Sequence, residues 1–382
     1  MELQRLEAAR AYAREQEDVL VALIKELCKI PAPSHQEGQR AAFIKNWFEK
    51  NGFSDVTIDA AQNVIAPVHC APNREVVVFM AHTDTVFPDL EPMPMRQENG
   101  RLYCPGVGDD TANLAALMLA ARYFNAQPQT ADCGFLFVAN SCEEGLGNLK
   151  GCRQLMQDYA GRVREVISFD GSLGSVCNKA VGSARYRVTV RTEGGHSFGA
   201  FGNRNAIHML ASMINTLYAV KPPAEGNSKT TYNVGSIEGG TSVNTIAQEA
   251  SMLYEYRSDC RSCLDKMKAM FESVVAAYRN MGIAVEVTLL GERPCMGEVD
   301  PARQQALEAR MTAALQSETG LTPSFHSSST DCNIPFSCGI PALSTGIYRG
   351  SGAHTREEFI ELASLPDGLR TMLAFLLSYL GA

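Results

Sequence analysis

The sequence predicts an α/β protein in which a three-layer α/β domain is interrupted by a smaller α+β domain. Three observations lead to this prediction. Helical and strand patterns alternate in the first third of the chain and again near its end. Between these two regions, the predicted strands have the alternating pattern of half-exposed strands, and helices and strands follow one another in a different order. The chain also has 382 residues, and that length favours two hydrophobic cores over one.

The first domain begins with two segments that have helical spacing of apolar residues, 18–30 and 38–53. The next segment, EVVVFMAHTD at 75–84, is an almost continuous apolar run, which is typical of a strand buried in a covered sheet. Further helices are predicted over 111–125 and 148–161, and further strands over 133–140 and 164–172. This alternation indicates a sheet with helices on both faces.

The inserted domain is predicted over residues 183–293. Its elements follow the order β-α-β-β-α-β, at residues 183–192, 205–220, 230–240, 249–258, 263–282 and 283–291. This order is typical of ferredoxin-like α+β domains. We therefore expect a discontinuous first domain, residues 1–182 and 294–382. In its second part a helix at 301–320, a strand at 339–347 and an amphipathic closing helix at 365–380 rejoin the first core.

Composition and charge exclude some functions. The chain has 34 basic and 42 acidic residues and a formal net charge of −8, which argues against a nucleic-acid surface. No apolar run approaches the ~20 residues of a membrane span. The N-terminal segment is charged and helical and has no apolar signal core, so we expect a cytoplasmic protein.

The twelve cysteines do not predict a zinc knuckle. The nearest pattern is the spacing of Cys260 and Cys263, and no second pair of this kind accompanies it. Cys28, Cys133 and Cys177 lie in apolar segments and are expected to be small buried hydrophobic residues.

Polar residues gather where the predicted strands of the first domain end, and in an open α/β sheet ligands bind at that edge. An isolated acidic residue at a helix start could be only a cap, and a lone histidine could be only structural. Together, however, these imidazoles and carboxylates suit zinc, manganese or cobalt, and the carboxylates would repel one another without cations. The candidates are His82, Asp84, Asp109, Asp110, Glu143, Glu144, Asp170 and His354.

The number of candidates fits a two-metal site. Two ions that share one bridging carboxylate need about five protein ligands. Five are available, and three further carboxylates remain, two of which have an expected role. Asp84 follows His82 by two residues and could hold its second ring nitrogen. Glu143 stays free of the metals and could take a proton from water. The five expected ligands are His82, Asp109, Glu144, Asp170 and His354.

These motifs resemble those of the M20 family of metallopeptidases, nearest to its peptidase T and carboxypeptidase G2-like branch. The resemblance covers nearly the whole chain, and STDCNIPFSCGIPA at 329–342 is also similar to that branch. It implies a zinc-peptidase-like catalytic domain with an inserted lid and dimerisation domain. The motifs, in the family's order, are MAHTDTV, GVGDDTANLAALM, NSCEEGLGNLKG, ISFDGS, GGHS and GAHTREEF.

The resemblance also implies how the ligands divide between two divalent ions, expected to be zinc. His82 and Asp170 would bind one ion, Glu144 and His354 would bind the other, and Asp109 would bridge the two.

The remaining roles follow from the same resemblance. Asp84 would orient His82, and Glu143 would be the general base and then the general acid. His196, in the lid, matches a histidine that reaches the partner's active site in dimeric members and steadies the oxyanion. Asn244 and Arg257 match positions that hold a substrate carboxylate, although Arg257 could also form an ordinary surface ion pair. A homodimer through the lid is therefore expected.

Two positions depart from the family pattern, and a third bears on the substrate. Thr111 replaces the usual lysine after the paired aspartates, and Ala247 replaces a common proline. Peptidase branches of the family tend to have aspartate at the position of Asp170. The expected function is a cytoplasmic dizinc exopeptidase of short peptides. The alternative is an amidohydrolase of N-acyl or N-carbamoyl amino acids. A non-catalytic binding protein would lack some of these ligands, and all are present.

Overall fold

The computed structural model describes residues 2–72 and 74–381. Contacts divide the chain into two compact units, the first formed by Met1–Lys179 with Glu298–Ala382 and the second by Ala180–Gly297. The boundaries expected from the sequence, at 182/183 and 293/294, lie a few residues inside the second unit. Each unit has its own hydrophobic core.

The first unit is built on an eight-stranded mixed sheet with the order β1-β2-β6-β3-β7-β16-β8-β15. The central neighbours β6, β3, β7 and β16 are parallel, and β2 runs antiparallel to β6. The strands are β1 (Thr57–Ile58), β2 (Val64–Val68), β3 (Val76–His82), β6 (Gly134–Asn140), β7 (Val163–Ser168), β8 (Ser175–Ala180), β15 (Ser324–Ser328) and β16 (Ala342–Thr345).

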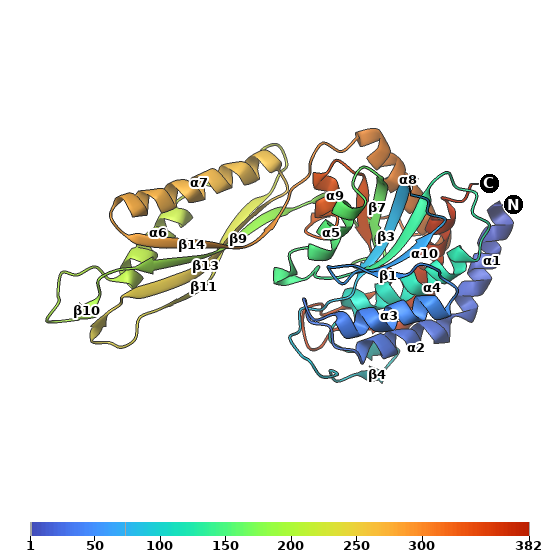
Figure 1. The fold of residues 1–382 in the computed structure, drawn as a ribbon, viewed down its shortest axis with the longest axis horizontal. Coiled ribbons are helices and arrows are strands. Elements are labelled where there is room, and N and C mark those ends of the chain that lie inside the picture. Colours follow the sequence, from blue (N-terminus) through green and yellow to red (C-terminus); the bar gives the residue numbers. More distant parts are fainter. Residues whose placement is uncertain (1, 73, 382) are drawn as a thin grey trace. The chain divides into compact units, whose positions relative to one another are not determined.

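Helices cover this sheet (Figure 1). Val77 and Phe79 of β3 join the core formed with α4 and α10, while Val78 and Met80 are equally buried on the opposite face. Burial on both faces explains the continuous apolar run of this strand. The helices are α1 (Glu2–Glu15), α2 (Glu17–Cys28), α3 (Gly38–Lys50), α4 (Asn113–Asn125), α5 (Lys150–Asp158), α8 (Pro301–Thr319), α9 (Asn333–Ser337) and α10 (Leu365–Leu377).

A small second sheet and three short helical turns complete the first unit. The sheet has the order β17-β18-β5-β4, formed by Gly350–Ser351, Phe359–Glu361, Arg101–Tyr103 and Arg96–Glu98. The turns are η1 (Val107–Ala112), η2 (Gly145–Gly147) and η3 (Leu362–Ser364).

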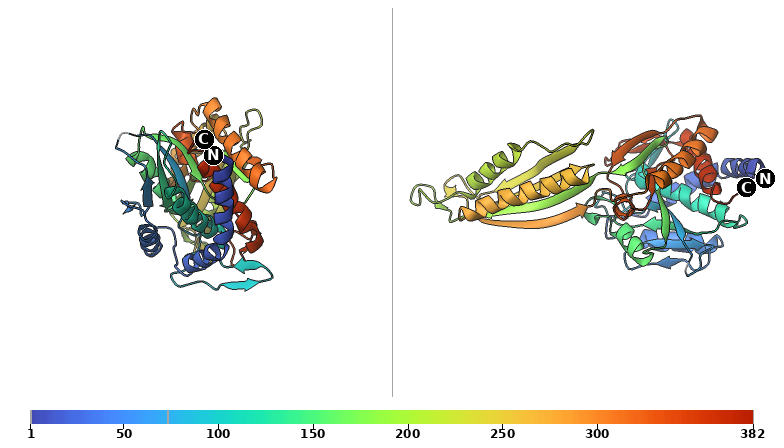
Figure 2. Two further views of the ribbon diagram at one scale, coloured as in Figure 1. Left: turned by 90° about the vertical axis from the view of Figure 1, so that its right-hand side faces the viewer. Right: turned by 90° about the horizontal axis from the view of Figure 1, so that it is seen from above.

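The second unit is a four-stranded antiparallel sheet, ordered β11-β13-β9-β14, with helices α6 and α7 packed on it. Figure 2 shows α7 lying along the strands. Along the chain the order is β9-α6-β11-β13-α7-β14, so the ferredoxin-like prediction is confirmed, and with it the fold class. The elements are β9 (Gly182–Arg191), β10 (Gly195–His196), α6 (Ala206–Tyr218), β11 (Thr230–Gly239), β12 (Thr245–Ile246), β13 (Glu249–Ser258), α7 (Arg261–Asn280) and β14 (Ala284–Arg293).

The strand register of the first unit brings distant parts of the sequence to one edge. His82 at the end of β3 pairs with Asn140 at the end of β6, and Met80 pairs with Ser168 at the end of β7. The residues that follow these strands therefore emerge side by side at the carboxyl edge of the sheet. Within the described part of the chain, no helix is both long and apolar enough to cross a membrane.

Candidate metal centre

Asp109 lies at the centre of the polar cluster on this edge. Its Oδ1 is 3.0 Å from Nε2 of His82, and its Oδ2 is 3.1 Å from Nε2 of His354. The same Nε2 of His354 is 3.3 Å from Oε1 of Glu144. One carboxylate thus lies between two imidazoles that are 272 positions apart in the chain (354 minus 82).

The donor atoms form two groups that share Asp109. One group is His82, Asp109 and Asp170, and the other is Asp109, Glu144 and His354. Within each group the donor atoms lie within 4.8 Å of one another. Each group could hold one divalent ion, with Asp109 common to both.

The neighbouring Asp110 has a different environment. Its Oδ2 accepts a hydrogen bond from the backbone N–H of His82 at 2.8 Å, and its Oδ1 accepts one from the side chain of Asn113 at 2.6 Å. Asp110 is buried and braces the end of β3, while Asp109 faces the imidazoles.

Both glutamates of the NSCEE segment are held by one carboxylate. Oδ1 of Asp84 accepts the backbone N–H of Glu143 at 2.9 Å, and Oδ2 accepts that of Glu144 at 3.0 Å. Nδ1 of His82 is 3.0 Å from the backbone oxygen of Asp84 and 3.5 Å from its Oδ1. Gly147 closes the turn that follows, where a Cβ atom would lie 2.7 Å from the backbone oxygen of Cys142.

The cluster carries a strong negative field. Burial raises the pKa of Asp170 to about 7, and the charge of Asp109 adds to this effect. Hydrogen bonds to Asp109 and Glu144 raise the pKa of His354 to about 10. Burial opposes ionisation of Asp109, but its bonds with His354 and His82 hold its pKa well below the usual range. Burial likewise opposes a charge on His82, yet the charge of Asp110 and the bond to Asp109 raise its pKa. The site therefore favours positive charge.

The sequence did not single out several residues that hold this cluster. Ser34 donates a hydrogen bond to Oδ2 of Asp84 at 2.7 Å. Glu358 is buried and accepts three backbone N–H groups, those of Gly106, Gly108 and Asp109, at 2.6–2.8 Å. In the sequence, only the position of Glu358 four residues after His354 could have pointed to its place beside the cluster.

A second bracing group lies next to the NSCEE segment. Oε1 of Glu37 accepts the backbone N–H of Cys142 at 3.0 Å, and the thiol of Cys142 is 3.3 Å from Nδ1 of His35. His35 is not among the candidate residues of the sequence analysis. Its neighbours show that it helps to hold the turn before Glu143.

Two of the remaining predicted residues, His196 and Asn244, lie together in the second unit. The short strands β10 and β12 pair His196 with Thr245, and the backbone N–H of Ser197 donates to the oxygen of Asn244 at 2.9 Å. Nδ1 of His196 accepts the backbone N–H groups of Phe198 and Gly199, at 3.3 and 3.2 Å. A neutral imidazole whose Nδ1 accepts hydrogen bonds carries its proton on Nε2. His196 therefore has a hydrogen-bond donor at Nε2.

Arg257, the third predicted residue of this unit, lies elsewhere. It is near the end of β13 and forms two hydrogen bonds with Glu255, both of 3.0 Å. The structure does not bring it to His196 and Asn244, which lie beside the start of β13. The distance along the strand from Glu249 to Arg257 is about 27 Å.

Comparisons with known proteins identify the family of the chain. The family model of peptidase family M20/M25/M40 matches residues 78–378. Among curated proteins, a succinyl-diaminopimelate desuccinylase of Bordetella parapertussis is 28% identical over 319 residues, covering 78% of this chain and 81% of that protein.

Solved structures share the fold. The aminopeptidase PepT of Bacillus cereus superposes with a TM-score of 0.72 at 23% identity, covering 95% of this chain and 98% of that one. The YXEP protein of Bacillus subtilis, described as a dinuclear metal-binding peptidase, has a TM-score of 0.65 at 14% identity, with coverage of 96% and 99%.

Proposed function

The chain belongs to peptidase family M20/M25/M40 and is an M20-type hydrolase, and we propose that it is a dinuclear zinc-dependent exopeptidase of short peptides. The observation that carries this proposal is the carboxylate of Asp109, which faces both His82 and His354. A carboxylate between two imidazoles is the arrangement that a bridging metal ligand needs.

The donor set fits two divalent ions. His82, Asp109 and Asp170 would hold one ion, and Asp109, Glu144 and His354 would hold the other. Imidazoles and carboxylates suit zinc, with cobalt and manganese as the other candidates. The pKa of His354 and that of Asp170 are both raised, so protons compete with divalent cations for these two side chains.

Glu143 is the proposed general base. The ions, when bound, supply Lewis-acid chemistry that lowers the pKa of water and polarises a carbonyl. Glu143 lies in one group with His82 and Glu144, all three buried, and its backbone N–H is fixed by Asp84. Its carboxylate would accept the proton of the attacking water and then deliver it to the leaving amine.

His196 is proposed to stabilise the oxyanion from a partner subunit. Its Nε2 presents the N–H that this role requires, and Asn244 lies beside it. Arg257 is about 27 Å further along β13, too far for one small substrate to meet both ends of the same second unit. In the proposed dimer, Arg257 of one subunit and the partner subunit's His196 would contact the same substrate molecule.

The second unit offers an apolar surface for such a dimer. Phe198 and Phe201 are each 90% exposed near His196, and Val243 precedes Asn244 fully exposed. On the side formed by α6 and the edge strand β11, Ile207 and Ile237 are also exposed. Large exposed apolar side chains and an unpaired strand edge favour association.

Arg257 is proposed to bind the substrate carboxylate. Its guanidinium donates two hydrogen bonds to the carboxylate of Glu255. Arginine binds carboxylates in this bidentate way, and a substrate carboxylate would compete with Glu255 for the same fork.

A second candidate function is hydrolysis of N-acyl or N-carbamoyl amino acids. It is favoured by the curated relatives, because those of Bordetella are named for removal of a succinyl group. The bond broken is an amide in both cases, so the metal centre does not distinguish them.

A substrate panel tests the proposal. The purified chain, loaded with zinc, cobalt or manganese, is assayed on di- and tripeptides beside N-acetyl, N-succinyl and N-carbamoyl amino acids. We expect the highest kcat/KM on a peptide. Preference for an N-acyl substrate would establish the second candidate, and no hydrolysis of either class with any metal would refute both.

A further inference from the structure

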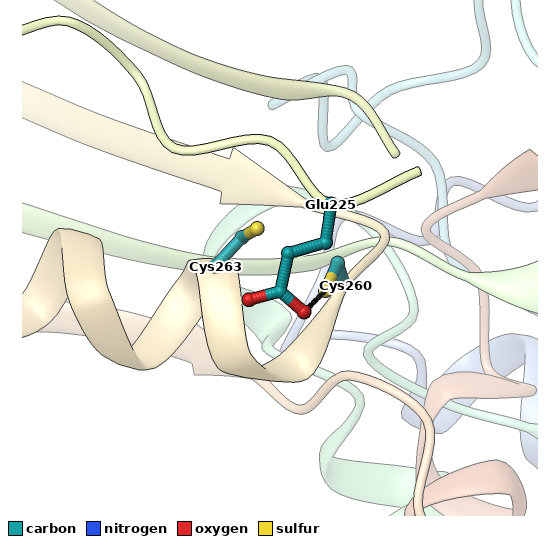
Figure 3. A group of neighbouring side chains, drawn as sticks. All are labelled: Glu225, Cys260 and Cys263. Carbon is teal, nitrogen blue, oxygen red and sulfur yellow. Dashed lines mark hydrogen bonds between the residues drawn. The ribbon is translucent and has the colours of Figure 1, made fainter. Parts of the chain in front are cut away.

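A second group of metal-binding residue types lies in the second unit and shares no residue with the strand-end cluster. It consists of Glu225, Cys260 and Cys263 (Figure 3). One donor atom from each residue lies within 4.8 Å of the other two. Figure 3 shows the side chain of Glu225 reaching from its loop toward the two cysteines at the start of α7.

The backbone explains why the two thiols meet. Cys260 is the N-cap residue of α7, and Cys263 lies three residues later in its first turn. Side chains at these two positions face each other at a helix start. Cys263 is fully buried, Cys260 is partly exposed, and Glu225 is exposed, so the group is anchored on one side and open to solvent on the other.

The distance between the Cys260 and Glu225 donor atoms fits tetrahedral coordination. The Sγ of Cys260 is 3.7 Å from Oε2 of Glu225. In a tetrahedral zinc site a sulfur and a carboxylate oxygen are about 3.6 Å apart, as follows from bond lengths of about 2.3 and 2.1 Å. Three protein ligands would leave a fourth position for solvent.

Neighbouring polar groups support bound thiolates. The hydroxyl of Ser262 is 3.3 Å from the Sγ of Cys260, and that of Ser228 is 3.9 Å from the Sγ of Cys263. Hydroxyls that hydrogen-bond ligand atoms in this way orient them and tune the site.

The charge count is also balanced. Nζ of Lys266 lies 2.6 Å from Oε1 of Glu225, which leaves Oε2 for the metal. Two thiolates and one carboxylate carry three negative charges, and a divalent ion with the Lys266 ammonium carries three positive ones. A neutral cluster at the positive end of α7 needs no further counter-ion.

We propose that Glu225, Cys260 and Cys263 form a binding site for one thiophilic divalent metal ion, of the zinc or cadmium class. Two sulfur ligands select such ions over magnesium or calcium. The site is separate from the strand-end cluster, whose ligands are imidazoles and carboxylates.

Cobalt binding tests the proposal on the full-length chain. Metal-free protein in phosphine reductant is titrated with Co²⁺, and thiolate-to-cobalt charge transfer is recorded in the near ultraviolet. Imidazole and carboxylate ligands give no such band, so the readout does not depend on hydrolysis or on the strand-end cluster. We expect about one thiolate-bound ion per chain. Cys260→Ser should abolish the band, and Glu225→Gln should weaken binding by at least about tenfold.

The control is Cys70→Ser, because Cys70 is an exposed thiol of the first unit that lies in neither group, and its band should equal that of the wild type. Cys260 and Glu225 are the chosen positions because both reach the surface and tolerate substitution better than Cys263. The proposal is overturned if the wild type gives no band, if Cys260→Ser keeps it, or if Glu225→Gln binds with unchanged affinity. A disulfide between Cys260 and Cys263 in unreduced protein, with no band after reduction, would assign the pair to redox chemistry instead.

Discussion

Oδ2 of Asp84 accepts the backbone N–H of Glu144 at 3.0 Å, while its other oxygen accepts that of Glu143 at 2.9 Å. One buried carboxylate therefore sets the position of both glutamates at once. Burial opposes its charge, but hydrogen bonds from His82, Ser34 and the Glu144 amide keep the pKa of Asp84 below its usual value. Asp84 thus remains an acceptor for both amides.

Replacement of Asp84 tests this arrangement. Asp84→Asn keeps the shape but offers only one accepting oxygen, so one buried N–H loses its partner. We expect a loss of about 1–3 kcal/mol in the free energy of unfolding and at least about tenfold weaker metal binding. Denaturant unfolding and metal titration measure both. Ser34→Ala removes only one of the hydrogen bonds to Asp84 and should cost less, so equal losses would contradict the central role of Asp84.

The two adjacent glutamates should respond differently to the same change. Glu143→Gln should lower kcat by about 10²–10⁴ and leave the metal content intact, because only proton transfer is lost. Glu144→Gln should lose metal, because it removes a proposed ligand. Elemental analysis beside kcat distinguishes the two. If Glu143→Gln retained near-normal kcat, the general base would have to be another group.

Glu358 is expected to be a positioning residue. It accepts the N–H groups of Gly106, Gly108 and Asp109, and thereby fixes the segment that carries the proposed bridging ligand. Glu358→Gln should cost about 1–3 kcal/mol in unfolding free energy and weaken metal binding. Its neighbour Glu357 is exposed and pairs with Arg96 at the surface. Glu357→Gln is therefore the matched control, with an expected change within about 0.5 kcal/mol.

Subunit mixing tests the origin of His196. Homodimers of Glu143→Gln and of His196→Ala should each be nearly inactive. In a mixed dimer, the intact Glu143 of one chain meets the partner's His196, which restores one site. Random exchange at equal amounts should recover about a quarter of wild-type activity. If the two variants remain inactive after exchange has been verified by mass, His196 acts within its own chain.

The pair formed by Arg257 and Glu255 allows a test in both directions. Arg257→Lys should raise KM by about 10- to 100-fold for substrates with a free carboxylate, with kcat little changed. Glu255→Gln frees the guanidinium and should lower KM for the same substrates. Substrates whose carboxylate is amidated should show neither effect. If KM were unchanged in both variants, Arg257 would be only a surface ion pair.

The prediction from sequence succeeded best where residues follow parallel strands. The apolar run that ends in His82 and the one that ends before Glu143 both indicated buried strands, and parallel strands place their carboxyl ends at one edge. Local pattern and topology were enough to group these residues, because strand direction leaves few alternatives. The ferredoxin-like order of the second unit was also confirmed, because it depends only on the succession of helices and strands along the chain.

Other relationships needed the tertiary structure. Glu358 lies 249 positions from Asp109, and no local pattern pairs a carboxylate with a backbone N–H at that separation. Nor could the spacing of Cys260 and Cys263 reveal that Glu225, from another loop, meets them. The sequence by itself determined the fold class, the family and the residue types at the sheet edge, because these depend on periodicity and order along the chain. The tertiary structure alone decided which buried groups share hydrogen bonds and which charges face each other, because those contacts depend on packing in three dimensions.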